Sequence, residues 1–98
     1  MKPPVFVTVR FHSQPHKVAE MKTLLQEIIS NTLSQEPGCV SYTYLQSIED
    51  QTLFTSLEVW QDAASEEAHW KMPHLADSLK KLPDLISGEP DIRKWHRI

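Results

Sequence analysis

Alternating apolar and polar positions open the chain and indicate a β-strand over residues 5–11. Valine and phenylalanine occupy every second position there, so one face of the segment is apolar. Over residues 16–33 the apolar spacing changes to three and four, which is the period of an amphipathic helix. Pro37 and Gly38 end this helix, because proline cannot continue it and glycine tolerates the turn that follows.

The remainder of the chain predicts two strands, an interrupted helix and a last strand. The two strands cover residues 39–46 and 52–60, and the short polar link between them predicts an antiparallel hairpin. Asp62 is placed to cap a helix over residues 63–71. Pro73 interrupts that helix, since the residue before a proline disfavours the helical conformation, and a second helical piece covers residues 74–81. Residues 91–98 read as the fourth strand.

This β-α-β-β-α-β order predicts an α+β fold of the ferredoxin-like type, in which helices cover one face of a four-stranded antiparallel sheet. The hairpin strands, however, carry apolar residues on both faces. Val40, Tyr42 and Tyr44 share one face of the first strand, and Leu45 lies on the other. Because the helices cover only one face, the second needs another cover. We therefore expect a homodimer that associates through its sheet faces.

Composition limits the classes of function. The chain has 98 residues, enough for a single domain over residues 1–98, and its net charge of −3 argues against nucleic-acid binding. Its one cysteine cannot form an intrachain disulfide, which is typical of a reducing compartment. There is no signal peptide and no apolar run of membrane-spanning length, so we expect a cytoplasmic protein with no membrane partner.

Candidate chemistry is concentrated in residues 58–74, which contain a carboxylate, two indoles and two imidazoles. Glu58 and Trp60 share one face of a strand, and His74 follows the helix break at Pro73. Histidine is the side chain best suited to move a proton near neutral pH, and a nearby carboxylate orients it. We therefore expect His69 or His74 to be a catalytic base with Glu58 as its orienting carboxylate.

Simpler readings compete with this catalytic one, and a lone histidine on a short helix is usually only a surface or half-buried hydrogen-bonding residue. Trp60 and Trp70 offer flat walls for a planar ligand, but a tryptophan at a strand end is also common in a core. Glu58 has Arg10 as a possible ion-pair partner across the sheet. The histidines are five apart, about 140° around a continuous helix, which predicts no metal site. No glycine-rich loop is present, so we expect no nucleotide cofactor.

Residues 57–62, 67–69 and 73–75 resemble the antibiotic biosynthesis monooxygenase (ABM) family in their Glu-x-Trp, acidic cap, Ala-His and Pro-His elements. Residues 37–42 resemble the family's entry into its second strand. The resemblance covers essentially the whole chain. It implies a dimeric α+β barrel with a pocket between sheet and helices, lined from Glu58, Trp60, His69 and His74. We also expect Trp70, Tyr44 and Arg10 to bind the substrate.

The resemblance implies a monooxygenase that needs no cofactor and acts with O₂ on a small, electron-rich aromatic such as a quinol. Two alternatives stay open. One is an isomerase of a small phosphorylated ketose, with Arg10, Lys71 or the basic residues of the last strand binding the phosphate. The other is a dimeric binding or stress module without catalysis. The haem-degrading branch is excluded, because residues 5–11 contain no asparagine of the kind that branch requires.

Overall fold

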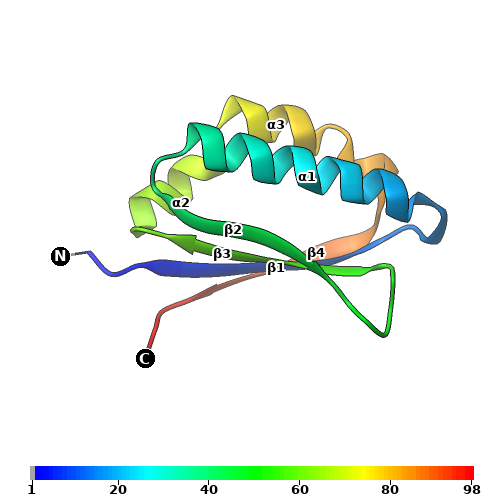
Figure 1. Cartoon of the computed structure of the whole chain (residues 1–98), viewed down its shortest axis with the longest axis horizontal. Helices are drawn as coiled ribbons and strands as arrows, with labels where there is room; N and C mark the ends of the chain where they lie inside the picture. The colour runs from blue at the N-terminus through cyan, green and yellow to red at the C-terminus, as the bar shows by residue number, and fades with distance from the viewer. Residues whose placement is uncertain (1) are drawn as a thin grey trace.

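The computed structural model describes residues 2–98, which form one antiparallel four-stranded sheet with helices on one face (Figure 1). The elements in chain order are β1 (Val5–Ser13), the 3₁₀ turn η1 (Pro15–Lys17), α1 (Val18–Gln35), β2 (Cys39–Gln46), β3 (Leu53–Trp60), α2 (Ala63–His69), α3 (Pro73–Leu79), η2 (Leu82–Asp84) and β4 (Ile86–Trp95). The strand order is β2-β3-β1-β4. This arrangement confirms the predicted ferredoxin-like α+β fold. No helix within residues 2–98 is long and apolar enough to span a membrane.

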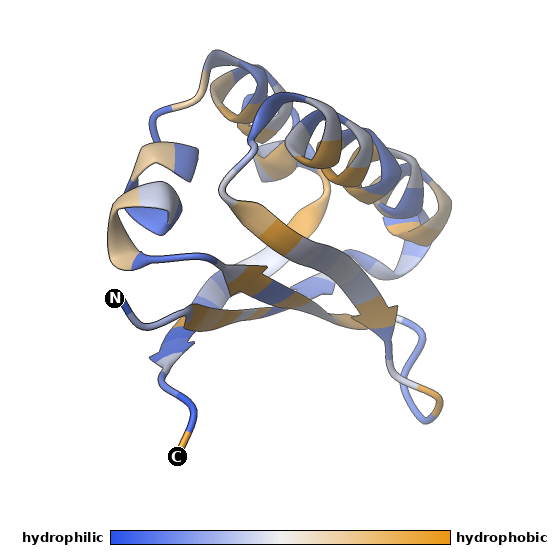
Figure 2. Cartoon of the chain, turned by 60° about the vertical axis from the view of Figure 1, so that its left-hand side comes forward, coloured by the Kyte–Doolittle hydropathy of each residue, from blue (hydrophilic) through white to orange (hydrophobic). Residues whose placement is uncertain are grey.

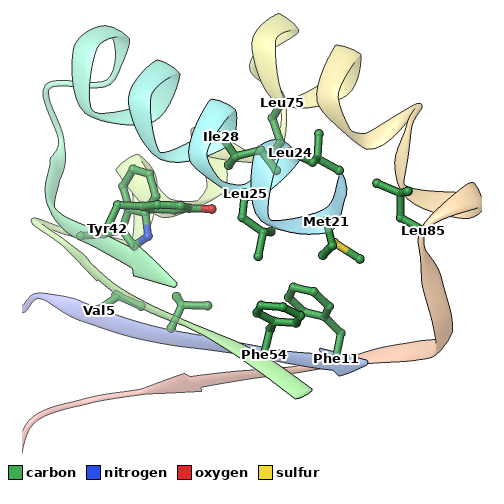
Figure 3. Close-up of a cluster of buried hydrophobic side chains, with 12 residues drawn as sticks. Val5, Phe11, Met21, Leu24, Leu25, Ile28, Tyr42, Phe54, Leu75 and Leu85 are labelled. Carbon is green, nitrogen blue, oxygen red and sulfur yellow. The ribbon is translucent and has the colours of Figure 1, made fainter. Parts of the chain in front are cut away.

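The core lies between the sheet and the helices. Phe11 of β1 and Phe54 of β3 stack with ring centroids 5.8 Å apart, and both point toward Met21 and Leu25 of α1 (Figure 3). The side of α1 that faces the sheet is apolar, and its outward side is polar (Figure 2). Burial of this apolar stripe is what holds the long helix to the sheet.

Two strand predictions were wrong in detail. The fourth strand begins at Ile86 rather than at residue 91, because Gly88, with φ of 78°, lets the strand continue through the expected loop. The strand ends at Trp95 rather than at residue 98. The pairing of β2 with β3 shifts between Cys39 and Ser41. This irregularity turns Val40 outward, to 64% exposure, while Cys39 packs against the core.

The second face of the sheet is open to solvent in the single chain. Leu45, Leu57 and Trp95 are 48%, 46% and 52% exposed there. The polar side chains of Thr8, Arg10 and Thr55 lie on the same face, between these apolar ones. The structure thus has the two-faced sheet predicted from the sequence, and the homodimer that would cover it stays a prediction.

Candidate active site

The centre of the site is Glu36, a residue that the sequence pattern did not single out. It caps the end of α1, where its backbone N–H donates to the carbonyl of Thr32 over 3.0 Å. Pro37 cannot continue the helix, so the chain turns toward β2 at this point. The turn directs the Glu36 carboxylate inward, where the residue is only 7% exposed. A buried carboxylate requires hydrogen-bond donors.

Two histidines supply those donors. His69 is the last residue of α2 and His74 the second of α3, and the turn over residues 70–72 folds one short helix back toward the other. Glu36 Oε2 lies 2.8 Å from His69 Nδ1 and 2.6 Å from His74 Nε2. Because the helix is broken, the 140° separation expected for continuous helix does not apply, and both rings contact one oxygen.

These three residues are the group in residues 2–98 that could hold a metal ion, since their ligand atoms lie within 4.8 Å of one another. A tetrahedral zinc ion with bonds of about 2.0–2.1 Å holds its ligand atoms about 3.3 Å apart. Glu36 Oε2 is closer than this to both ring nitrogens, at 2.8 and 2.6 Å. Hydrogen bonds therefore account for the spacing, and a metal would require the three side chains to separate.

His69 is the histidine that reaches the interior cavity. Its Nδ1 faces Glu36, and its Nε2 lies 3.4 Å from the hydroxyl of Tyr42. The Trp60 indole packs against the imidazole with ring centroids 4.7 Å apart. His74 does not line the cavity, and its Nδ1 is buried without a hydrogen-bond partner. The geometry thus separates the two histidines into one that faces the cavity and one that lies behind it.

The cavity has a volume of about 150 Å³ and lies between the sheet and the helices. Most of its wall is apolar and comes from α1, α3 and β4, including Leu25, Ile28, Leu75, Leu79, Ile86 and Ile92. The polar groups gather on one side and comprise Tyr42, Tyr44, Glu58 and His69. An apolar cavity with a few convergent polar groups is typical of a small-molecule site.

Glu58 is hydrogen-bonded to neither histidine, contrary to the orienting role expected for it. Its carboxylate accepts hydrogen bonds from Trp60 Nε1 at 3.0 Å and from the Ser56 hydroxyl at 2.7 Å. Both partners lie two residues away on the same face of β3, so the strand itself satisfies this carboxylate. Burial raises the pKa of Glu58, and the hydrogen bonds from Ser56 and Trp60 partly oppose that rise.

The predicted substrate-binding residues divide between the two faces of the sheet. Tyr44 and Trp70 line the cavity, and their binding of a substrate stays a prediction. Trp60 is fully buried behind His69 and does not line it. Arg10 lies on the opposite face, where it borders a shallow hollow of about 540 Å³ with Thr55 and Arg93. That hollow contains none of the Glu36, His69 or His74 side chains, so Arg10 is remote from the candidate chemistry.

The loop between α2 and α3 is held by a third buried carboxylate, Glu66. Glu66 is 2% exposed, and it accepts hydrogen bonds from Trp70 Nε1 at 2.6 Å and from Lys94 of β4 at 2.9 Å. These bonds position Trp70 at the cavity wall. Cys39 has no comparable setting for reactivity, because burial raises the pKa of its thiol to about 11.

Sequence comparisons identify relatives across most of the chain. The sequence profile of the family described as Antibiotic biosynthesis monooxygenase matches residues 4–81. An uncharacterized protein of Synechocystis, sll1783, is 30% identical over 90 residues, or 92% of this chain. The chain spans 60% of the length of that relative.

Structural comparisons agree on the fold. A conserved protein from Methanosarcina mazei Go1 superposes with a TM-score of 0.92 at 27% identity, covering 98% of this chain and 94% of that one. The protein PA3566 of Pseudomonas aeruginosa gives a TM-score of 0.90 at 22% identity, covering 100% of this chain and 97% of its own. The second likeness, at this identity, supports the fold alone.

Proposed function

The chain belongs to the antibiotic biosynthesis monooxygenase family, and from this premise we propose that it is a cofactor-independent oxygenase of a small, electron-rich phenol or quinol. The observation that carries the proposal is the setting of His69. One ring nitrogen is held by the buried carboxylate of Glu36, and the other faces an apolar cavity. A base with an orienting carboxylate is the group that ionisation of a phenol requires.

The proposed reaction begins with transfer of a proton from the substrate hydroxyl to His69 Nε2. Glu36 stabilises the resulting imidazolium through its bond to Nδ1. The phenolate, richer in electrons than the phenol, then reduces O₂. For a hydroquinone the balance closes with O₂ alone: one oxygen atom enters the ring, the other leaves as water, and the product is a hydroxyquinone. The substrate supplies all the electrons, and the apolar wall keeps water from the intermediates.

The size of the cavity restricts the substrate. A dry apolar cavity of about 150 Å³ accommodates benzene, and the cavity beside His69 is of that volume. A single aromatic ring therefore fits without rearrangement. We propose a one-ring quinol or phenol as the substrate class, in preference to a fused polycyclic compound.

Charge favours the oxygenase over the phosphoketose isomerase. A phosphate needs cationic or N–H donors around it, and no lysine or arginine is among the cavity-lining residues of the described chain. Arg10 lies on the other face of the sheet, and Lys71 is exposed. The non-catalytic module is less well supported, because the His69 ring adjoins a cavity and is hydrogen-bonded to a carboxylate rather than to the backbone.

Oxygen uptake with hydroquinone tests the proposal. We expect protein-dependent O₂ consumption that His69→Gln lowers about a hundredfold, within the range for loss of a general base. His16→Gln, which changes an exposed histidine in η1, is the matched control and should leave the rate unchanged. Turnover of a phosphorylated ketose without O₂ uptake would instead support the isomerase. Equal O₂ uptake by wild type and His69→Gln would contradict the proposed role of the base.

A further inference from the structure

Two tyrosine hydroxyls lie between the cavity and the proposed base. Tyr42 and Tyr44 are alternate residues of β2, so both side chains are on the helix-covered face of the sheet. The Tyr42 hydroxyl is 3.4 Å from His69 Nε2, and the Tyr44 hydroxyl is 3.2 Å from that of Tyr42. Both tyrosines line the cavity. A continuous path of polar atoms thus joins the cavity to His69 and, through its ring, to Glu36.

The direction of the hydrogen bonds follows from Glu36. An ionised carboxylate only accepts, so His69 Nδ1 must donate to it, and the neutral ring then carries a lone pair on Nε2. Tyr42 therefore donates its hydroxyl proton to Nε2 and accepts one from Tyr44. This assignment leaves the oxygen of Tyr44 as the acceptor for a hydroxyl group bound in the cavity.

We propose that Tyr42 and Tyr44 form a hydroxyl relay that carries the substrate proton to His69. The inference rests on the proposed function. In one concerted step the substrate O–H proton passes to Tyr44, the Tyr44 proton passes to Tyr42, and the Tyr42 proton passes to His69 Nε2. Each tyrosine breaks one O–H bond and forms another, so both end neutral. The products are a substrate phenolate and the His69 imidazolium beside Glu36.

Burial of the two hydroxyls supports a relay over a tyrosine acting as the base itself. Burial, the largest cause, raises the pKa of both hydroxyls above the ordinary value for tyrosine, so neither side chain can hold a negative charge for long. The two hydroxyls are 3.2 Å apart, which is longer than the usual 2.5–3.0 Å of an O–H···O bond, and the Tyr42 hydroxyl is 3.4 Å from His69 Nε2, so the relay requires both contacts to shorten. Catalytic hydrogen bonds of this kind often tighten only when substrate is bound.

A purely structural role is the rival explanation, since the two rings also pack edge to face with centroids 5.6 Å apart. Tyr42→Phe and Tyr44→Phe keep the rings and remove only the hydroxyls. We expect each variant to lower kcat about tenfold to a hundredfold with a weakly acidic hydroquinone, the range of general acid–base catalysis. With a phenol acidic enough to be ionised in the buffer, the same variants should lose less than about twofold, because no proton remains to be moved.

Equal losses on the two substrates would assign the hydroxyls a structural role and overturn the relay. An unchanged kcat of both variants on both substrates would also overturn the relay. The solvent deuterium isotope effect gives a second kinetic measure: it should be large for wild type with hydroquinone and curve with deuterium fraction, as expected when several protons move. A linear dependence, which reports a single proton, would contradict the relay.

An equilibrium measurement separates failure of the relay from failure of the oxygenase. In a buffer acidic enough to keep free 4-nitrophenol un-ionised, the nitrogen NMR shift of the His69 ring should change when this phenol binds to wild type, and it should change far less in Tyr42→Phe at matched occupancy. This result would support the relay even if wild type consumes no O₂. The same His69 response in both proteins would overturn the relay, whatever the oxygenase assay shows.

Discussion

At the scale of single residues, one carboxylate oxygen determines the geometry of the site. Glu36 Oε2 contacts both His69 and His74, and each ring can donate only one of its nitrogens to it. The shared oxygen thereby fixes the orientation of both imidazoles and makes the nitrogen that faces it the donor of each ring. Only His69 has its second nitrogen near the cavity polar groups, so the two histidines have different tasks despite the common partner.

Replacing Glu36 tests this arrangement. Glu36→Gln removes the charge that stabilises the His69 imidazolium, and we expect kcat for hydroquinone oxidation to fall about a hundredfold or more. KM should change little, because Glu36 does not line the cavity. Glu27→Gln is the matched control; this carboxylate contacts Ser78 and Lys81 and does not line the cavity. A large rise in KM at unchanged kcat would show that Glu36 acts in binding instead.

The pH dependence of stability tests the environment of Glu58. Burial raises the pKa of Glu58 in the folded protein above its ordinary value of 4.5. At a pH between the pKa of the unfolded state and that of the folded state, the folded protein therefore binds more protons than the unfolded protein. Stability therefore falls as pH rises through that range. Glu58→Gln cannot ionise and should escape this loss, so its unfolding free energy relative to wild type should increase from acidic to neutral pH. Urea denaturation at several pH values measures the difference; a pH-independent gap would contradict the raised pKa.

At the scale of elements, the position of α2 depends on a close approach to the turn before β2. A Cβ added at Gly38 would lie 2.3 Å from Ser65 Oγ and 2.5 Å from Ser65 Cβ. Real carbon atoms do not approach so closely, so a side chain at Gly38 must displace the first turn of α2. The turn that contains Gly38 directly follows Glu36, and α2, which contains Ser65, ends at His69. The packing of Gly38 against Ser65 is therefore coupled to the geometry of the site.

Gly38→Ala should accordingly destabilise the fold by about 1–3 kcal/mol, the usual cost of overpacking. Thermal unfolding measures the effect. Combining it with Ser65→Gly removes the obstructing side chain, and the double variant should be more stable than additive single effects predict. Additive losses would show that the Gly38–Ser65 contact is not the cause.

Local patterns predicted the elements well and the site only in part. Strand alternation, the Asp62 cap and the break at Pro73 are all short-range signals, and the structure has each of them: Asp62 accepts from the Ser65 N–H at 2.8 Å. Glu36 was missed because it lies in a turn, outside any periodic pattern, 33 residues before His69. The role of Glu58 was mispredicted, although Ser56 and Trp60 at positions two before and two after it were a visible local signal.

At the scale of the whole molecule, the open sheet face requires an explanation of its own. Its exposed leucines and tryptophan lie on β2, β3 and β4, away from the helices that cover the cavity. Apolar side chains gathered on one sheet face mark an interaction surface. We propose that a second copy of the chain covers this face, giving a homodimer in which each subunit keeps its own cavity.

Light scattering on the purified protein tests the dimer. We expect twice the mass of one chain for wild type and a monomer for Leu57→Arg, because Leu57 is 46% exposed at the centre of the open face. Leu33→Arg is the matched control, since Leu33 is 53% exposed on α1 and should leave the dimer intact. A wild-type monomer, or dissociation by both variants alike, would contradict association through the sheet.

The central claim is that a histidine held by a buried carboxylate drives oxygenation of a one-ring quinol in this cavity. The most direct measurement is mass spectrometry of the product formed from hydroquinone under isotopically labelled O₂. The account predicts a hydroxyquinone that carries one labelled oxygen atom, formed by wild type and by His16→Gln but only marginally by His69→Gln. A product without the label, or labelled product formed equally by His69→Gln, would contradict it.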